Sequence, residues 1–368
     1  MDLSPSRETC AELQGLVFDG LPADAEAQMA RLYGNVYALP AQWKLTGMLA
    51  GNIGSYVESC GNELTAIIVF TRDGRRVRVL NEGHCFPAAL LERFSAQMFS
   101  QGNADVVVLH AVQADPVAAY PSFAYECLED IVLDLPPTEE AYFSRLGGAT
   151  RSYIKRYLNK LKKTFPTLSH EIASRADIRE KDILDLIALN KLRMEQKGKV
   201  AGIDEVETRR IVALAKECGI LSVFRIDGRI IAGTINFQAG SNVFLETIAH
   251  DPEWNDYRVG TLCCYLTICE CIRRGAREYH FLWGPHDYKF RLLGVERRLC
   301  HLTIYRSRLE MARHPLVAAG DLKARLRRQA QSLRRRLKEE GGIAGFARML
   351  APWSGGSSGP RRGAGPAG

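Results

Sequence analysis

Residues 221–249 read LSVFRIDGRIIAGTINFQAGSNVFLETIA. Three runs rich in β-branched and aromatic residues are separated here by the turn segments Asp227-Gly228 and Ala239-Gly240-Ser241-Asn242. This pattern is typical of consecutive antiparallel strands. We expect the three strands over Leu221–Ile226, Ile230–Phe237 and Val243–Ala249.

The residues that follow add a helical crossover. A loop over His250–Gly260 leads into a helix over Thr261–Arg274, which Gly275 ends. Further strands are expected over Glu278–Trp283 and Leu299–Tyr305. Hairpins followed by a strand–helix–strand crossover predict a mixed sheet, and therefore an α/β (α+β) fold.

The residues before this region predict another α/β unit. A hairpin is expected over Glu63–Leu80, a helix over Pro87–Gln101, and strands over Ala104–Leu109 and Asp130–Leu135. Four more helices are then expected, over 139–146, from Gly148 to Pro166, over 177–197 and over 204–218. The second of these is strongly basic.

The composition is that of an ordinary globular protein, with 46% hydrophobic and 25% charged residues among 368. No apolar run reaches the roughly 18 residues of a membrane span, and the first residues lack the pattern of a secretory signal. None of the ten cysteines forms a C-x-x-C pair, so we expect reduced thiols and no metal. We therefore expect a cytoplasmic protein.

Two segments carry candidate functional residues. In Asp251–Thr261, Arg258 and Gly260 precede a helix, and the free N–H groups of a helix N-terminus attract phosphate. The alternative is a tight turn that needs only the glycine. In Trp283–Arg291, an imidazole, a carboxylate, a phenol and an ammonium follow one strand. The alternative for these is an ordinary solvated loop.

The segment from about Leu135 to Leu309 resembles the BioF2-like (CelD-like) acetyltransferase family. This family is a branch of the GNAT superfold and is related to the Fem aminoacyltransferases. The residues that carry the resemblance occur in the order of the family. They are Tyr142–Leu146, Arg151 with the basic helix, Gly228–Gly233, Asp251-Pro252-Glu253 with Gly260, and Gly284 with Tyr288-Lys289.

The resemblance implies two GNAT-like domains in tandem, of which the first is degenerate. The expected division is an N-terminal segment (1–30), the degenerate domain (31–135), the GNAT acyltransferase domain (136–312), a basic amphipathic helical tail (313–350) and a disordered tail (351–368). The implied activity is N- or O-acyl transfer from acyl-CoA (acetyl-CoA) to an amine or hydroxyl acceptor. The implied context is exopolysaccharide or cell-envelope biosynthesis, as for cellulose.

In GNAT-type transfer the acceptor attacks the thioester directly, which requires a general base and donors for the oxyanion. We interpret Glu246 and His286 as candidate bases. The expected donor-binding residues are Tyr257, Arg258, Val259, Gly260 and Thr261, and the expected substrate-binding residues are Asp287, Tyr288 and Lys289.

The sequence departs from the usual GNAT donor motif, [RQ]-x-x-G-x-[GA]. Tyr257 stands where the motif has Arg or Gln, and Leu262 stands where it has a small residue. A larger acyl-CoA, an acyl carrier protein and an aminoacyl-tRNA therefore stay open as donors. A Fem-like aminoacyl-tRNA-dependent transferase and a non-catalytic GNAT-like scaffold of a polysaccharide synthase are the alternative functions.

The net charge of +7 is concentrated near the C-terminal end, where residues 321–338 hold eight basic residues and one acidic residue. Within this segment Leu322, Leu326, Ala330, Leu333 and Leu337 recur at helical spacing. The pattern predicts peripheral contact with an anionic inner-membrane surface. Docking of the leucines on the protein body, a synthase complex and RNA contact are the alternatives, and the neutral remainder argues against a general nucleic-acid surface.

Overall fold

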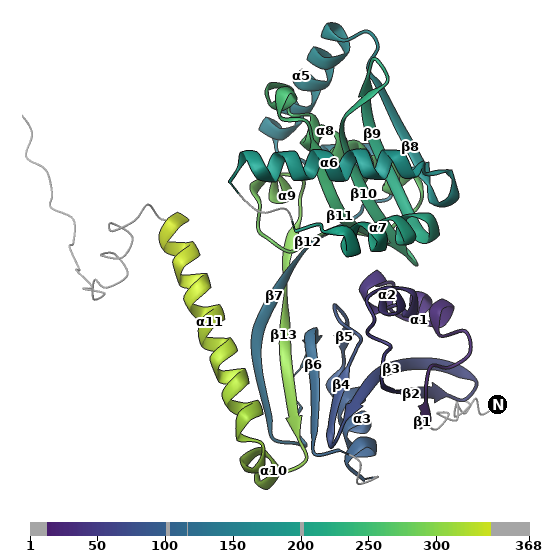
Figure 1. The fold of residues 1–368 in the computed structure, drawn as a ribbon, viewed down its shortest axis with the longest axis vertical. Helices are drawn as coiled ribbons and strands as arrows, with labels where there is room; N and C mark the ends of the chain where they lie inside the picture. The colour runs from purple at the N-terminus through teal and green to yellow at the C-terminus, as the bar shows by residue number, and fades with distance from the viewer. Residues whose placement is uncertain (1–12, 101–103, 116, 199–201, 340–368) are drawn as a thin grey trace, which may run out of the picture. The chain divides into compact units, whose positions relative to one another are not determined.

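The computed structural model describes residues 13–100, 104–115, 117–198 and 202–339 (Figure 1). The strands of the first half are β1 (Leu13–Asp19), β2 (Asn52–Cys60), β3 (Glu63–Asp73), β4 (Arg76–Val79), β5 (Cys85–Phe86), β6 (Val106–Ala114) and β7 (Ser122–Asp134). Its helices are α1 (Ala25–Tyr33), the 3-10 turn η1 (Val36–Ala38), α2 (Pro40–Leu45) and α3 (Ala88–Ser100).

The second half contains most of the helices. Its strands are β8 (Ser169–Ser174), β9 (Gly219–Ile226), β10 (Arg229–Ala239), β11 (Asn242–His250), β12 (Glu278–Leu282) and β13 (Val295–Tyr305). Its helices are α4 (Glu139–Arg145), α5 (Gly148–Thr164), η2 (Arg175–Asp177), α6 (Glu180–Gln196), α7 (Glu205–Cys218), η3 (Pro252–Tyr257), α8 (Val259–Arg273), α9 (Asp287–Arg291), α10 (Arg308–Arg313) and α11 (Pro315–Glu339).

One arrangement of elements occurs twice along the chain. Strands β2, β3 and β4 are antiparallel neighbours, and helix α3 then crosses over to β6, which is parallel to β4. Strands β9, β10 and β11 are likewise antiparallel neighbours, and α8 crosses over to β12, which is parallel to β11. The predicted mixed α/β fold with two GNAT-like halves in tandem is confirmed.

The two halves exchange their last strands. Strand β7 of the first half pairs with β12 of the second, and β13 of the second half pairs with β6 of the first. Between them β7 and β13 pair antiparallel along their length. The described strands therefore form one continuous sheet, in the order β1-β2-β3-β4-β6-β13-β7-β12-β11-β10-β9-β8, with β5 beside β6.

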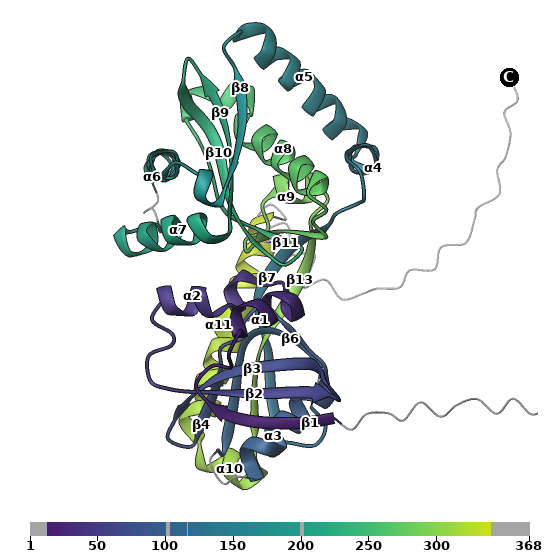
Figure 2. The same ribbon diagram turned by 90° about the vertical axis from the view of Figure 1, so that its right-hand side faces the viewer.

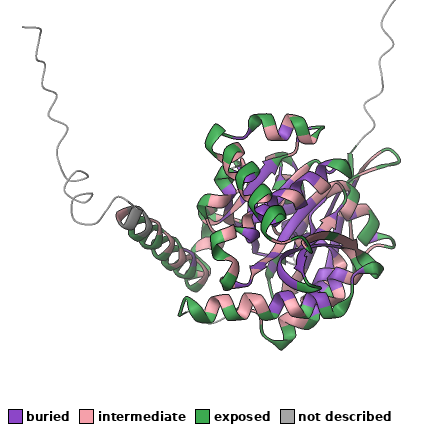
Figure 3. Ribbon diagram, turned by 90° about the horizontal axis from the view of Figure 1, so that it is seen from above, coloured by how far each residue is buried: buried purple, intermediate pink, exposed green. Residues whose placement is uncertain are grey.

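Helices cover both faces of the second-half sheet, with α6 and α7 on one face and α8 with α5 on the other (Figure 2). One apolar core lies beneath α8 and includes Ile154, Val259 and Tyr279, and another lies beneath α6 and α7 and includes Leu186 and Leu214. Burial is concentrated in the strands and on the helix faces that meet them (Figure 3).

Most residues of helix α8 are buried. Its four cysteines, Cys263, Cys264, Cys269 and Cys271, are free thiols inside the core. Burial raises the pKa of the thiols of Cys263, Cys269 and Cys271 to about 12 in each case. They pack as small apolar side chains, because a thiol with such a pKa stays protonated at neutral pH.

Residues 319–339 form a unit separate from residues 13–318, and helix α11 is described below by itself. Among the described residues, no helix combines the length and the apolar character needed to cross a membrane. The predicted domain boundaries stay predictions, and the predicted disordered tail, 351–368, lies outside the described residues.

Candidate donor and active site

The sheet opens between β11 and β12. The two strands pair in parallel over only three positions, ending at Phe244 and His280, and then separate. On its other side, β11 carries a bulge opposite Ile235 and Asn236, and Glu246 is the extra residue. Divergence of this kind leaves backbone N–H and C=O groups of both strands without strand partners.

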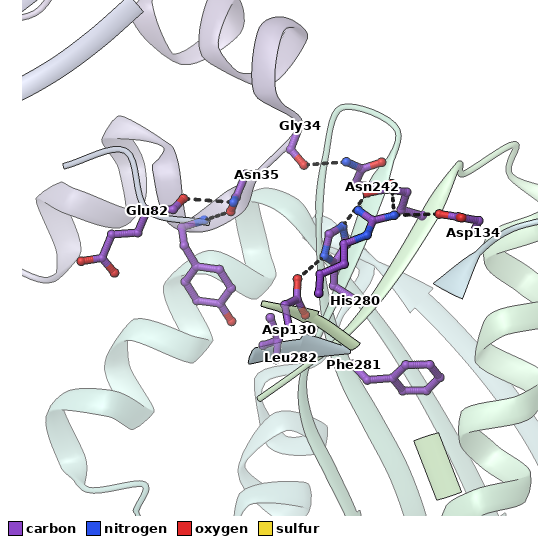
Figure 4. Close-up of polar contacts among 12 residues, drawn as sticks. Gly34, Asn35, Glu82, Asp130, Asp134, Asn242, His280, Phe281 and Leu282 are labelled. Atoms are coloured by element: carbon purple, nitrogen blue, oxygen red, sulfur yellow. Dashed lines mark hydrogen bonds and ion pairs between the residues drawn. The ribbon is translucent and has the colours of Figure 1, made fainter. Parts of the chain in front are cut away.

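A buried ammonium group satisfies the carbonyls on the β12 side of this opening. The Nζ atom of Lys289 donates to the carbonyl oxygens of Phe281, Leu282 and Trp283 at 2.8, 2.9 and 2.7 Å. Leu282 has a φ of 58°, a strained conformation for a residue other than glycine. The three bonds hold this bend at the end of β12; Figure 4 shows Phe281 and Leu282 at this point of the strand.

The predicted role of Lys289 as a substrate-binding cation does not fit this geometry. The residue is 3% exposed, and its three N–H bonds all point at carbonyl oxygens. Burial lowers the pKa of Lys289 to about 8, so the ammonium form still predominates at neutral pH. Lys289 therefore positions the end of β12 and leaves no donor for a ligand.

A pocket of about 320 Å³ lies at the N-terminus of α8. Helix α6 contributes Arg193 and Lys197 to its lining, and the start of α8 contributes Arg258, Gly260 and Thr261. No side chain caps α8 at this end, so its first N–H groups are available to a ligand. Three cations and the positive end of a helix dipole make this pocket suited to a phosphate or diphosphate.

Gly260 is required by close packing at the pocket. A Cβ atom at this position would lie 2.9 Å from Nδ1 of His250. His250 is fixed by a hydrogen bond of 2.9 Å between its Nε2 and Oδ1 of Asn255. Burial lowers the pKa of His250, and the nearby Arg193 and Lys197 lower it further, so the imidazole is neutral.

The structure places the five predicted donor-binding residues in three different environments. Arg258, Gly260 and Thr261 line the pocket. Val259 is fully buried in the core, so only its backbone can meet a ligand. The ring of Tyr257 packs against Phe165 and Trp254 instead, and the Nζ atom of Lys160 lies 4.4 Å from its centroid.

Sequence reasoning missed Arg193 and Lys197. They lie four residues apart, so both fall on one face at the C-terminal end of α6. Nη1 of Arg193 also donates to the carbonyl of Ile248 on β11 at 3.2 Å, which ties the pocket to the opened strand. No local motif marks these residues, because the donor segment that they join lies far along the chain.

The two candidate bases lie on different elements. Oε1 of Glu246 accepts from Arg210 at 2.6 Å and Oε2 accepts from the hydroxyl of Tyr37 at 2.9 Å. Burial raises the pKa of Glu246, and the charge of Arg210 opposes this rise. His286 is exposed and precedes α9. Neither residue lines the donor pocket.

The other two predicted substrate-binding residues belong to α9. Asp287 is exposed in its first turn. Tyr288 is half-buried, and its ring stacks with the ring of His286 at a centroid distance of 6.3 Å. Burial raises the pKa of Tyr288, so its phenol stays protonated and can donate a hydrogen bond.

The first half of the chain supplies residues on the other side of β11 and β12. The Tyr37 ring lies 5.5 Å from that of Trp283. At the paired start of β11, Nδ2 of Asn242 donates to the carbonyl of Gly34 at 3.1 Å, and Figure 4 shows Gly34 beside Asn242. The site is therefore built from both halves.

His280 links β12 to β7. Its Nδ1 lies 2.7 Å from Oδ2 of Asp130, and its ring stacks on Phe244 at 4.2 Å. Burial lowers the pKa of His280, but the contacts with Asp130 and Glu278 outweigh burial and raise it overall. The imidazolium form is therefore favoured in the folded protein.

The comparisons with known proteins agree with this geometry. Residues 148–290 match the family model described as an acetyltransferase (GNAT) domain. Over these residues the second half is therefore similar to a GNAT acetyltransferase domain, and the pocket at the start of α8 and the opened strands lie inside the matched range. The comparison with curated proteins gives no match.

The solved structure described as FemX is 11% identical, and the similarity covers 76% of this chain and 94% of FemX with a TM-score of 0.58. The C-terminal domain (DUF2156) of a putative lysylphosphatidylglycerol synthetase from Agrobacterium fabrum is 12% identical, with coverage of 78% and 92% and a TM-score of 0.46. At these identities, the likeness to FemX shows a shared fold.

Replacing Lys289 with methionine should destabilise the protein strongly. The change leaves three buried carbonyls without a donor, and each such loss costs about 1–3 kcal/mol. We expect the free energy of unfolding in urea to fall by about 3 kcal/mol or more. Arg291→Met on the exposed face of the same short helix should change it by less than about 0.5 kcal/mol. Equal effects of the two substitutions would contradict the positioning role.

The raised pKa of His280 should make stability depend on pH. Because the folded pKa exceeds the unfolded value of about 6.5, this group stabilises the fold fully below that value, and the contribution is lost as pH rises through the folded pKa. The free energy of unfolding in urea, measured from below about pH 6.5 upward, should fall as the pH rises in the wild type and should not show this fall in His280→Gln. His170→Gln, which alters a histidine whose pKa is lowered by burial, should keep the loss.

Proposed function

We propose that this protein is a GNAT-type acyltransferase that moves an acyl group from acyl-CoA, or a related thioester, to an amine or hydroxyl acceptor. The observation that carries the proposal is the pocket at the N-terminus of α8. It brings together the first N–H groups of α8 with Arg193, Lys197 and Arg258, and Arg193 also bonds to Ile248 on β11, beyond the point where β12 separates from it. A diphosphate-bearing donor fits such a pocket, and its acyl end can then reach the opened strands.

The reaction we propose is a direct displacement. The acceptor nitrogen or oxygen forms a bond with the thioester carbonyl carbon, the carbon–sulfur bond breaks, and the thiolate leaves with the electron pair. A base takes the acceptor proton, and a proton returns to the sulfur. Backbone N–H groups of β11 beyond Phe244 are placed to stabilise the oxyanion, because β12 no longer pairs with them.

Glu246 and His286 stay our candidates for the base. Burial raises the pKa of Glu246 and so brings it closer to neutral pH, which suits general-base catalysis. His286 has the advantage of exposure and of an imidazole. Replacing each of the two residues with glutamine shows which one acts as the base. With a saturating acyl-CoA donor and glucosamine as the acceptor, the rate of CoA release should fall by about 100-fold or more in the variant that lacks the general base. The other variant should not show this loss.

The acceptor class rests on the resemblance to the BioF2-like family. We propose a carbohydrate or amine acceptor in exopolysaccharide or envelope biosynthesis, and a cytoplasmic location. An aminoacyl-tRNA donor and a non-catalytic scaffold are the competing functions, and the donor experiment distinguishes them.

The experiment is thermal unfolding with acetyl-CoA, longer acyl-CoAs and free CoA. A ligand at a hundred times its dissociation constant that binds only the folded state adds roughly 2.7 kcal/mol. Arg193→Gln removes a charge-assisted contact and should raise the dissociation constant by about tenfold or more. Arg209→Gln, an exposed arginine of α7 outside the pocket, should keep the full shift.

Each shift is measured against the unliganded melting temperature of the same variant, since Arg193 also bonds to β11. No shift with any CoA would remove the proposed donor. Stabilisation by aminoacyl-tRNA would then favour the Fem-like function, and the absence of any donor binding would favour the scaffold.

A further inference from the structure

Helix α11 combines an exposed apolar stripe with a dense positive charge. Leu322, Leu326 and Leu333 are 49%, 57% and 42% exposed. At 3.6 residues per turn these leucines, with Ala319 and Ala330, fall within about 80° of one another around the helix. They form a continuous strip, which we call the leucine stripe.

Cations flank this stripe. Lys323, Arg327 and Arg334 are exposed along one edge of it and Arg325 is exposed along the other. Helix α11 contains two acidic residues, Asp321 and its last residue, Glu339. Long basic side chains at the edges of an apolar strip can hold their charged ends in the headgroup region while the leucines enter the acyl chains.

We infer that α11 is a membrane-surface helix that lies in the interface of an anionic bilayer. The positive charge of α11 and its exposed apolar area together favour this partner. A nucleic acid would neutralise the cations but offers no apolar phase to the leucine stripe. A second α11 would cover the leucines but would bring two strongly cationic helices together, which repel each other. An anionic bilayer satisfies both features.

The inference is independent of the acyl transfer proposed above. The leucine stripe and its cations lie in residues 319–339, whereas the donor pocket is formed by residues of the unit that ends at Ala318. The helix would hold the protein at the membrane surface.

The test is flotation of the full chain with vesicles of phosphatidylcholine alone and of phosphatidylcholine mixed with phosphatidylglycerol. We expect binding to the anionic vesicles only, weakened by salt. Leu322→Gln with Leu326→Gln should lower the partition coefficient by about tenfold or more. Lys323→Gln with Arg327→Gln should lower it by roughly fivefold for each cation removed.

Matched controls alter the same residue types elsewhere. Leu184→Gln changes an exposed leucine of α6, and Arg209→Gln changes an exposed arginine of α7; both should bind vesicles like the wild type. Circular dichroism and the melting temperature show whether each variant is folded.

Three results would overturn the inference. They are failure of the folded wild type to bind anionic vesicles, binding that the leucine variants do not weaken, and binding of a single-stranded RNA oligonucleotide in place of vesicles. Absence of a CoA shift with intact vesicle binding would reject only CoA as the donor, and a CoA shift without vesicle binding would reject only the membrane helix.

Discussion

The pairing of β7 with β13 is the interaction on which the rest of the structure depends. It runs from Val132 opposite Val295 to Ser122 opposite Ile304. Each of these strands also completes the sheet of the other half, since β7 borders β12 and β13 borders β6. Neither half can close its sheet from its own sequence, so the tandem repeat folds as one continuous sheet.

This exchange places the functional site. Because β7 supports one edge of β12, the other edge is free to separate from β11 after three paired positions. Lys289 then supplies hydrogen-bond donors to the carbonyls at the bend. Helix α8 packs against β10 and β11, and its N-terminus carries the cationic pocket. The first half contributes Tyr37, which bonds to Glu246 on the bulged strand. The first half thus contributes a side chain to the candidate site in the second half.

Local patterns in the sequence were sufficient for much of the second half. The hairpins of β9, β10 and β11 follow from strand runs divided by Asp227-Gly228 and by residues 239–242, and α8 begins and ends close to its predicted bounds. The segment before α8 could be proposed as a donor site from the sequence, because a helix N-terminus with an adjacent glycine is a local signal; its role in donor binding stays a prediction. Gly260 lies at the predicted place, and its close approach to His250 gives the reason.

Features that depend on distant residues could not be predicted in the same way. The strand exchange leaves no local mark, and β7 extends well before the predicted strand over Asp130–Leu135. The edge strand β8 was missed because Ser169–Ser174 has a weak apolar pattern. Lys289 reads as an exposed loop cation in sequence, and only the fold shows three carbonyls converging on it. Arg193 and Lys197 reach the donor segment across the sheet.

The central claim is that the donor binds where α8 begins, beside the separated strands. A crystal structure of the protein with bound CoA tests it most directly. We expect diphosphate oxygens within hydrogen-bonding distance of the N–H groups of residues 259–261 and of the Arg193 guanidinium, with the thiol end directed into the opening between β11 and β12. CoA bound at another place, with this pocket left empty, would contradict the account.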